Sequence, residues 1–156
     1  MLSRRVQTEG THARLLGCTV DRNSTIGVFV SKGAQARTRG GSITASGSSG
    51  VEIRDRRSTL RALDTAFVDN GRVAIYVHSA ASALCKRCRV EPADGCAVLC
   101  GGRAGIDLGG GTVALDSCAV AHAERNVIRH GGRIFDTDTF SSGSSSEMSA
   151  GGSSRP

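Results

Sequence analysis

The sequence predicts an all-β fold, a right-handed parallel β-helix of about five coils with three short strands per coil. Two observations predict it. In several short segments a small residue precedes two apolar residues that are separated by one position, the alternation of a half-buried strand. These segments also return along the chain at near-regular intervals, at 27–30, 50–53, 74–77 and 97–100.

One apolar anchor per unit measures the repeat. The anchors are Val20, Ile43, Phe67, Val90 and Val120, and the steps between them are 23, 24, 23 and 30 residues. A period of this length is typical of a solenoid. The longer last step predicts an insertion near Gly101–Thr112, as a loop or a bulged corner.

Each unit contains three pairs of inward positions, in chain order. The first strand has Ala13 and Leu15, Ala36 and Thr38, Leu60 and Ala62, Ala83 and Cys85, Val113 and Leu115. The second has Cys18 and Val20, Gly41 and Ile43, Thr65 and Phe67, Cys88 and Val90, Cys118 and Val120. The third has Val28 and Val30, Val51 and Ile53, Ile75 and Val77, Val98 and Cys100, Ile128 and His130.

These 30 inward positions hold no Asp, Glu, Lys or Arg, although 22% of the chain is charged. Three strands within about 23 residues leave no room for a helix, which disfavours ankyrin or leucine-rich solenoids. A strand that returns once per coil in the same direction stacks parallel on its copy about 4.8 Å away. The handedness of β crossovers then favours a right-handed coil.

The segment C-T-V-D-R-N-S-T-I-G-V-F-V, residues 18–30, is a typical unit of this pattern. The chain from about Ala13 to Phe135 resembles the right-handed β-helix repeat family, found in pectate-lyase-like enzymes and in the substrate-recognition half of F-box β-helix proteins. The first resemblance implies a sugar groove along a strand face. The second implies a rigid scaffold that binds another protein.

Composition divides the chain into three parts. We expect a loose lead-in over 1–12, the β-helix over 13–140, and a disordered Ser/Gly-rich tail over 141–156. The formal net charge of +6 is compatible with a polyanionic partner. The sequence has no apolar stretch of membrane length and no signal-peptide pattern, so we expect an intracellular protein without membrane contact.

The cysteines form a spacing that resembles a zinc site, with Cys85, Cys88, Cys96 and Cys100 separated by two, seven and three residues. Three of them, however, occupy inward positions on different strands. Cys18, Cys88 and Cys118 share a single position of the repeat, where a small apolar side chain fits. Packing in the core is therefore favoured over a metal site or a disulfide, and we predict no metal and no cofactor.

Basic residues stack on the outside of the first strand. We name the basic strip after six residues: Arg14, Arg37, Arg39, Arg61, Lys86 and Arg87. Like charges in register repel one another, so a protein partner or an acidic ligand is an attractive explanation. A solvated surface is the alternative. Nucleic acid is disfavoured because no aromatic residue is interleaved to stack bases.

A second outward group, the polar patch, lies on the third strand and contains Glu52, Arg54, Tyr76 and His78. These side-chain types could supply an acid, a base and charge neutralisation in a β-elimination. Related enzymes use clustered carboxylates, and here only Asp55 accompanies Glu52. A binding surface or a cross-strand charge pair are the alternatives.

The sequence thus favours a non-enzymatic β-helix scaffold that binds a protein or an acidic ligand through the basic strip and the polar strand face. The alternative is a carbohydrate-active enzyme, a polysaccharide lyase or hydrolase, or a degenerate remnant of one, acting at the polar patch. Open coil ends also leave self-association as an option.

Overall fold

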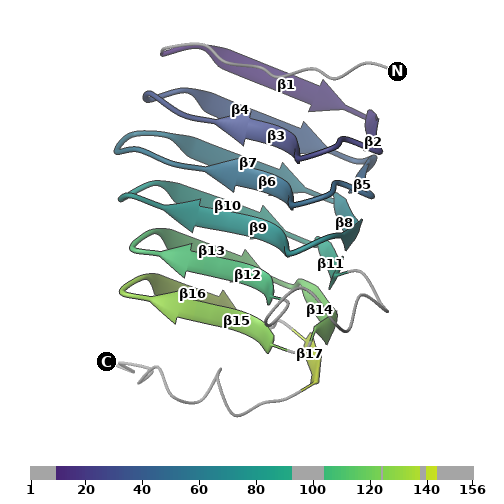
Figure 1. The fold of residues 1–156 in the computed structure, drawn as a ribbon. Helices are drawn as coiled ribbons and strands as arrows, with labels where there is room; N and C mark the ends of the chain where they lie inside the picture. The colour runs from purple at the N-terminus through teal and green to yellow at the C-terminus, as the bar shows by residue number, and fades with distance from the viewer. Residues whose placement is uncertain (1–9, 93–103, 124, 138–139, 144–156) are drawn as a thin grey trace.

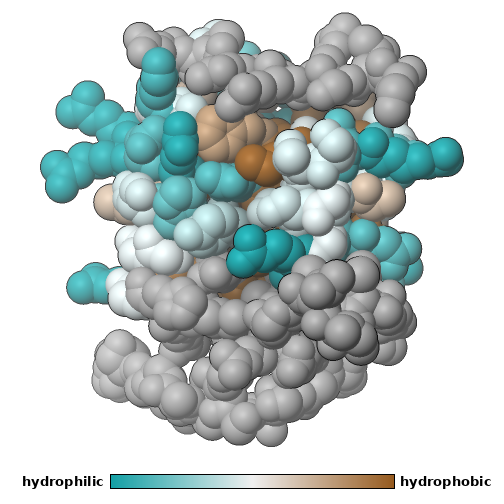
Figure 2. Space-filling view, viewed as in Figure 1, coloured by the Kyte–Doolittle hydropathy of each residue, from teal (hydrophilic) through white to brown (hydrophobic). Residues whose placement is uncertain are grey.

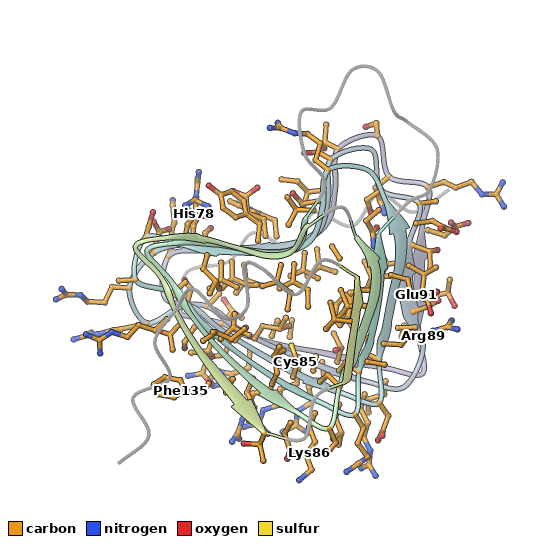
Figure 3. The ribbon with its side chains drawn as sticks, turned by 90° about the horizontal axis from the view of Figure 1, so that it is seen from below. His78, Cys85, Lys86, Arg89, Glu91 and Phe135 are labelled. Atoms are coloured by element: carbon orange, nitrogen blue, oxygen red, sulfur yellow. The ribbon has the colours of Figure 1, made fainter. Side chains whose placement is uncertain are left out.

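The computed structural model describes residues 10–92, 104–123, 125–137 and 140–143. The chain winds through three parallel sheets in rotation, so that each coil adds one strand to each sheet (Figure 1). Neighbouring strands in every sheet are parallel copies from successive coils, as expected for a β-helix. Seen along the axis, the three sheets surround one interior filled by side chains (Figure 3).

The strands fall into three stacks. The first sheet contains β1 (His12–Leu16), β4 (Gln35–Arg39), β7 (Thr59–Leu63), β10 (Ser82–Lys86), β13 (Thr112–Asp116) and β16 (Arg133–Thr137). The second contains β2 (Thr19–Asp21), β5 (Ser42–Thr44), β8 (Ala66–Asn70), β11 (Arg89–Pro92), β14 (Ala119–Ala123) and β17 (Phe140–Gly143). The third contains β3 (Ile26–Val30), β6 (Ser49–Ile53), β9 (Val73–His78), β12 (Ala104–Gly109) and β15 (Arg125–His130).

The predicted register is confirmed throughout the first sheet and at the anchors of the second. Ala36 pairs with Leu60, and Ile43 pairs with Phe67. Phe67 is fully buried and has the largest side chain in the core. The other residues of the core cluster are aliphatic or cysteine. Each coil contributes one layer of side chains to the narrow interior, and small and β-branched side chains fill it at close packing.

The predicted register of the third sheet is wrong after β9. Ile106 and Leu108 pair with Ile75 and Val77, so they take the inward positions expected of Val98 and Cys100, which lie outside the described residues. The insertion therefore precedes β12, within the interval between Pro92 and Ala104. Within the expected site at 101–112, the described residues 104–109 form β12, and Gly110 and Gly111 form the corner before β13.

The shift continues into β15. Val127 pairs with Ile106, whereas Ile128 pairs with Asp107, one residue away from the predicted register. Arg129, and not the predicted His130, pairs with Leu108. In the coil before β15, residues 97–100 and 106–108 both have the alternating apolar pattern of the third strand. Pairing with β9 shows that 106–108 form that strand.

A buried asparagine stabilises the corner between the second and third sheets. Asn70 Nδ2 donates to the Ile43 carbonyl at 2.9 Å, and its Oδ1 accepts the Ser46 backbone N–H at 3.1 Å. Asn23 occupies the equivalent corner of the first described coil and is also buried. Its Nδ2 has no hydrogen-bond partner, which is consistent with the absence of a preceding coil in the described part of the chain.

The cysteine position of the repeat has a shared hydrogen-bond geometry. The side chains of Cys18, Thr65, Cys88 and Cys118 each donate to the carbonyl two residues earlier, over 3.0–3.4 Å. The residue just before each of these four has a positive φ, so the chain turns sharply there. A small side chain with a weak or strong donor thus suits this corner better than a purely apolar one.

The core prediction for the cysteines is confirmed at Cys85, Cys88 and Cys118, which are buried and form no disulfide. It is wrong for Cys18, which is exposed because it lies in the first described coil. Cys96 and Cys100 lie outside the described residues. The expected domain boundaries stay predictions, since most of the lead-in and of the tail is not described.

Candidate functional site

The arginines of the basic strip are brought together by the first sheet. Arg14, Arg37 and Arg61 are direct neighbours on β1, β4 and β7, one strand spacing of about 4.8 Å apart. All three are exposed. None of the three has an acidic side chain within ion-pair distance among the described residues. Their charges are therefore available to a ligand.

The other cations of the strip differ in their surroundings. Arg39 pairs with Leu16 and Leu63 in the same sheet and is exposed. Lys86 Nζ lies 2.8 Å from an Asp116 carboxylate oxygen. Because Asp116 also accepts a hydrogen bond from Ser117, its pKa is held below the usual range, first by Lys86 and then by Ser117. The charge of Lys86 is thus largely compensated.

Arg87 does not belong to the strip in space. Its guanidinium makes two hydrogen bonds to the Asp64 carboxylate at 2.7 and 3.0 Å, at the corner between the first and second sheets. These bonds lower the pKa of Asp64, and the nearby charge of Arg39 adds to the effect. Four cations of the basic strip therefore have no carboxylate partner among the described residues: Arg14, Arg37, Arg39 and Arg61.

Two shallow grooves run over the outer face of the first sheet. One has a volume of about 440 Å³ and the other about 500 Å³. Both are lined by Arg37, Arg61 and Leu84, so they meet in the middle of the sheet. In Figure 3, Lys86 and Phe135 point outward from this sheet whereas Cys85 points into the core. This face combines exposed cations with a surface that is indented enough to hold a ligand.

The polar patch lies on a different face, over β3, β6 and β9. His78 Nε2 lies 3.1 Å from Glu52 Oε1, and its Nδ1 lies 3.0 Å from the Ser79 hydroxyl. The rings of Tyr76 and His78 stack with centroids 4.3 Å apart. The side chains of His78 and Glu52 are only 18% and 16% exposed, so water reaches the pair poorly. Figure 2 shows this face, where mainly hydrophilic side chains surround a few hydrophobic ones.

Arg54 and Asp55 do not join that pair. The Arg54 guanidinium lies over the Phe29 ring, 4.8 Å from its centroid. Asp55 accepts the backbone N–H of Lys32 at 3.0 Å and so stabilises a corner. Of the four residues of the polar patch, the structure places Glu52, Tyr76 and His78 in mutual contact and directs Arg54 elsewhere. On the next strand, β12, Asp107 pairs with Tyr76, so a second acidic residue adjoins the patch along the chain's register.

Several relevant residues were not identified from the sequence. Asp64 and Asp116 compensate two of the strip's cations, and Phe135 extends the column of Arg14 and Arg37 to β16. Asp64 lies one 23-residue repeat before Arg87, which is a signal that could have identified this pair. Among the residues described, no group of three or more His, Cys, Asp or Glu side chains could hold a metal ion.

The parallel stacking of three sheets around one core defines the protein as a β-solenoid. The chain belongs to the family whose model is described as the right handed beta helix region, which matches residues 5–154. The predicted right-handed parallel β-helix is thereby confirmed. No curated protein and no solved structure matches the chain. Within the described ranges, no helix is long and apolar enough to cross a membrane.

Proposed function

We propose that this β-helix is a binding scaffold that holds an acidic partner against the outer face of its first sheet. The observation that carries the proposal is the in-register column of Arg14, Arg37 and Arg61, exposed and without acidic neighbours in the described structure. The strands that carry these arginines are about 4.8 Å apart, so their positive charges repel one another. A bound polyanion would remove that repulsion. The two grooves over the same residues supply contact area for such a ligand.

The test uses a fluorescent polyglutamate peptide and fluorescence anisotropy at low salt. The variant Arg37→Glu with Arg61→Glu should weaken binding by at least roughly tenfold. A matched control, Arg22→Glu with Arg72→Glu, changes two exposed arginines at corners away from the first sheet. Each pair of substitutions lowers the formal net charge of +6 by four, two for each residue. Equal weakening of peptide binding by both pairs of substitutions would mean that net charge alone causes the effect, which would contradict the proposal.

A second candidate function is carbohydrate cleavage at the polar patch, favoured by the hydrogen-bonded Glu52–His78 pair and the ring of Tyr76 beside it. A histidine oriented by a carboxylate is a usable general base. Incubation with polyuronate should then release unsaturated products detected by ultraviolet absorbance, and Glu52→Gln should abolish their release. A wild-type chain that releases no product would eliminate this candidate and leave the scaffold function unaffected.

A further inference from the structure

The outer face of the first sheet changes character along the solenoid axis. Its central column begins with three arginines and continues with three apolar residues; the six, in strand order, are Arg14, Arg37, Arg61, Leu84, Ala114 and Phe135. Phe135 is 60% exposed, one of the two large hydrophobic side chains exposed among the described residues. Arg61 is the cross-strand neighbour of Leu84, and Lys86, two residues further along β10, is compensated by Asp116. The central column is therefore cationic in one half and apolar in the other, and the apolar half is flanked by the Lys86–Asp116 pair and by exposed Arg133.

The two halves form one continuous surface. The grooves that meet at Arg37, Arg61 and Leu84 extend in one direction to Arg14 and in the other to Ala114. The column from Arg14 to Phe135 spans five strand spacings, about 24 Å. A ligand that is anionic along its whole length would compensate only the arginines and leave Phe135 exposed to water. The surface thus fits a ligand with an acidic half and an apolar half.

The backbone of the sheet limits the form of that ligand. Within β4 and β7 the N–H and C=O groups lie in the plane of the sheet and pair with the strands on both sides. A polypeptide that lies across this face finds no backbone partners there, so the backbone groups that it buries against the face must be paired internally. An α-helix meets this requirement, and an extended segment does not.

The spacing of the column favours the same form. A helix presents one side chain per turn on a given face, with a pitch of about 5.4 Å. This is close to the strand spacing of about 4.8 Å, and flexible arginines accommodate the difference. Same-side residues of an extended chain are about 6.7 Å apart, so they lose register within two steps. A helix of about 16 residues covers the whole column.

We infer that the first sheet binds an amphipathic α-helix of a partner protein, with acidic turns over Arg14, Arg37 and Arg61 and apolar turns over Leu84, Ala114 and Phe135. This inference rests on the proposed function, because it names the kind of acidic partner that the basic strip holds. Helices that lie in grooves through residues one turn apart are a common recognition mode. The apolar half distinguishes such a partner from a nucleic acid or a polyuronate, which lack one.

The experiment compares two labelled 18-residue peptides with the full chain by anisotropy and circular dichroism. One carries Glu at one-turn intervals in one half and Leu in the other, made in both chain directions; the control carries Glu throughout. We expect the Glu–Leu peptide in one direction to bind on the order of tenfold more tightly than the control and to gain helical signal on binding. Phe135→Ser should remove that advantage without changing the binding of the control peptide.

The outcomes separate this inference from the proposed function. Equal affinity of the two peptides, with both lost in Arg37→Glu with Arg61→Glu, would overturn the helix partner and keep the acidic-partner function. Tighter binding of a polyuronate or an oligonucleotide than of the Glu–Leu peptide would also overturn it. Failure of all these probes to bind would overturn both proposals. Phe135 is an exposed residue, so its substitution leaves the fold intact, as thermal unfolding of the variant would check.

Discussion

Arg87 and Asp64 occupy equivalent corners of successive coils and are joined by two hydrogen bonds, 2.7 and 3.0 Å long. Both residues have a φ of +49°. The same left-handed turn thus recurs one coil apart and places an acid directly beside a base. This relationship removes Arg87 from the basic strip and makes the corner sensitive to pH.

The Asp64–Arg87 pair predicts a stability difference that depends on pH. The pKa of Asp64 is lower in the folded chain than its ordinary value of 3.8, mainly because Arg87 donates to it. The pair's contribution is therefore complete above that ordinary value and is lost as the pH falls through the lowered folded-state pKa. Asp64→Asn should unfold at lower urea concentration than the wild type at pH 7, and the two should converge at acidic pH. A difference that is unchanged at acidic pH would contradict this account.

The asparagine corners provide a matched pair of substitutions. Asn70→Ala leaves the Ile43 carbonyl and the Ser46 N–H buried without their partner, which should cost about 2–4 kcal/mol in the free energy of unfolding. Asn23→Ala removes an amide nitrogen that already has no partner, so its cost should be roughly 1 kcal/mol or less. Urea denaturation measures both. Equal costs would mean that the hydrogen bonds of Asn70 do not determine its contribution.

The buried thiols should resist alkylation. A hydrogen bond from Cys118 favours the Cys88 thiolate, but hydrogen bonding with Cys85 and burial outweigh it and raise the pKa of Cys88 to about 12. Hydrogen bonding to Cys88 and burial raise the pKa of Cys118 as well. Iodoacetamide at pH 8 should modify exposed Cys18 before Cys88 and Cys118, which stay protected until the chain unfolds. Peptide mass spectrometry follows each site, and modification of Cys88 at the rate of Cys18 would show that the core opens readily.

Neighbouring positions on β6 test the inward and outward faces. Val51 is fully buried between Val28 and Ile75, so Val51→Asp buries an unpaired charge and should abolish cooperative unfolding. Glu52→Lys faces outward and only breaks the contact with His78, which should cost roughly 1 kcal/mol. Thermal unfolding by circular dichroism distinguishes them. Comparable effects of the two would mean that the strand's register is incorrect.

The sequence determined the fold class because paired inward positions that recur about every 23 residues are all buried when the repeats form a stack of parallel strands. It also placed Arg14, Arg37 and Arg61 in one column, since side chains alternate strictly across a strand. The same reasoning identified Glu52, Tyr76 and His78 as neighbours on one face. Each of these conclusions needs only local alternation and a constant step.

The tertiary structure decided which of two similar segments forms a strand and in which direction the long side chains point. The segments at 97–100 and 106–108 both alternate correctly, and only pairing with β9 selects Ile106 and Leu108. The orientation of Arg54 toward Phe29, and the compensation of Arg87 by Asp64, depend on rotatable side chains that a periodic pattern does not specify. Backbone repetition and the order of residues in the outward column therefore follow from sequence, whereas the ion-pair partners of Lys86 and Arg87 and the place of Phe135 at the end of that column emerge only when the coils are stacked.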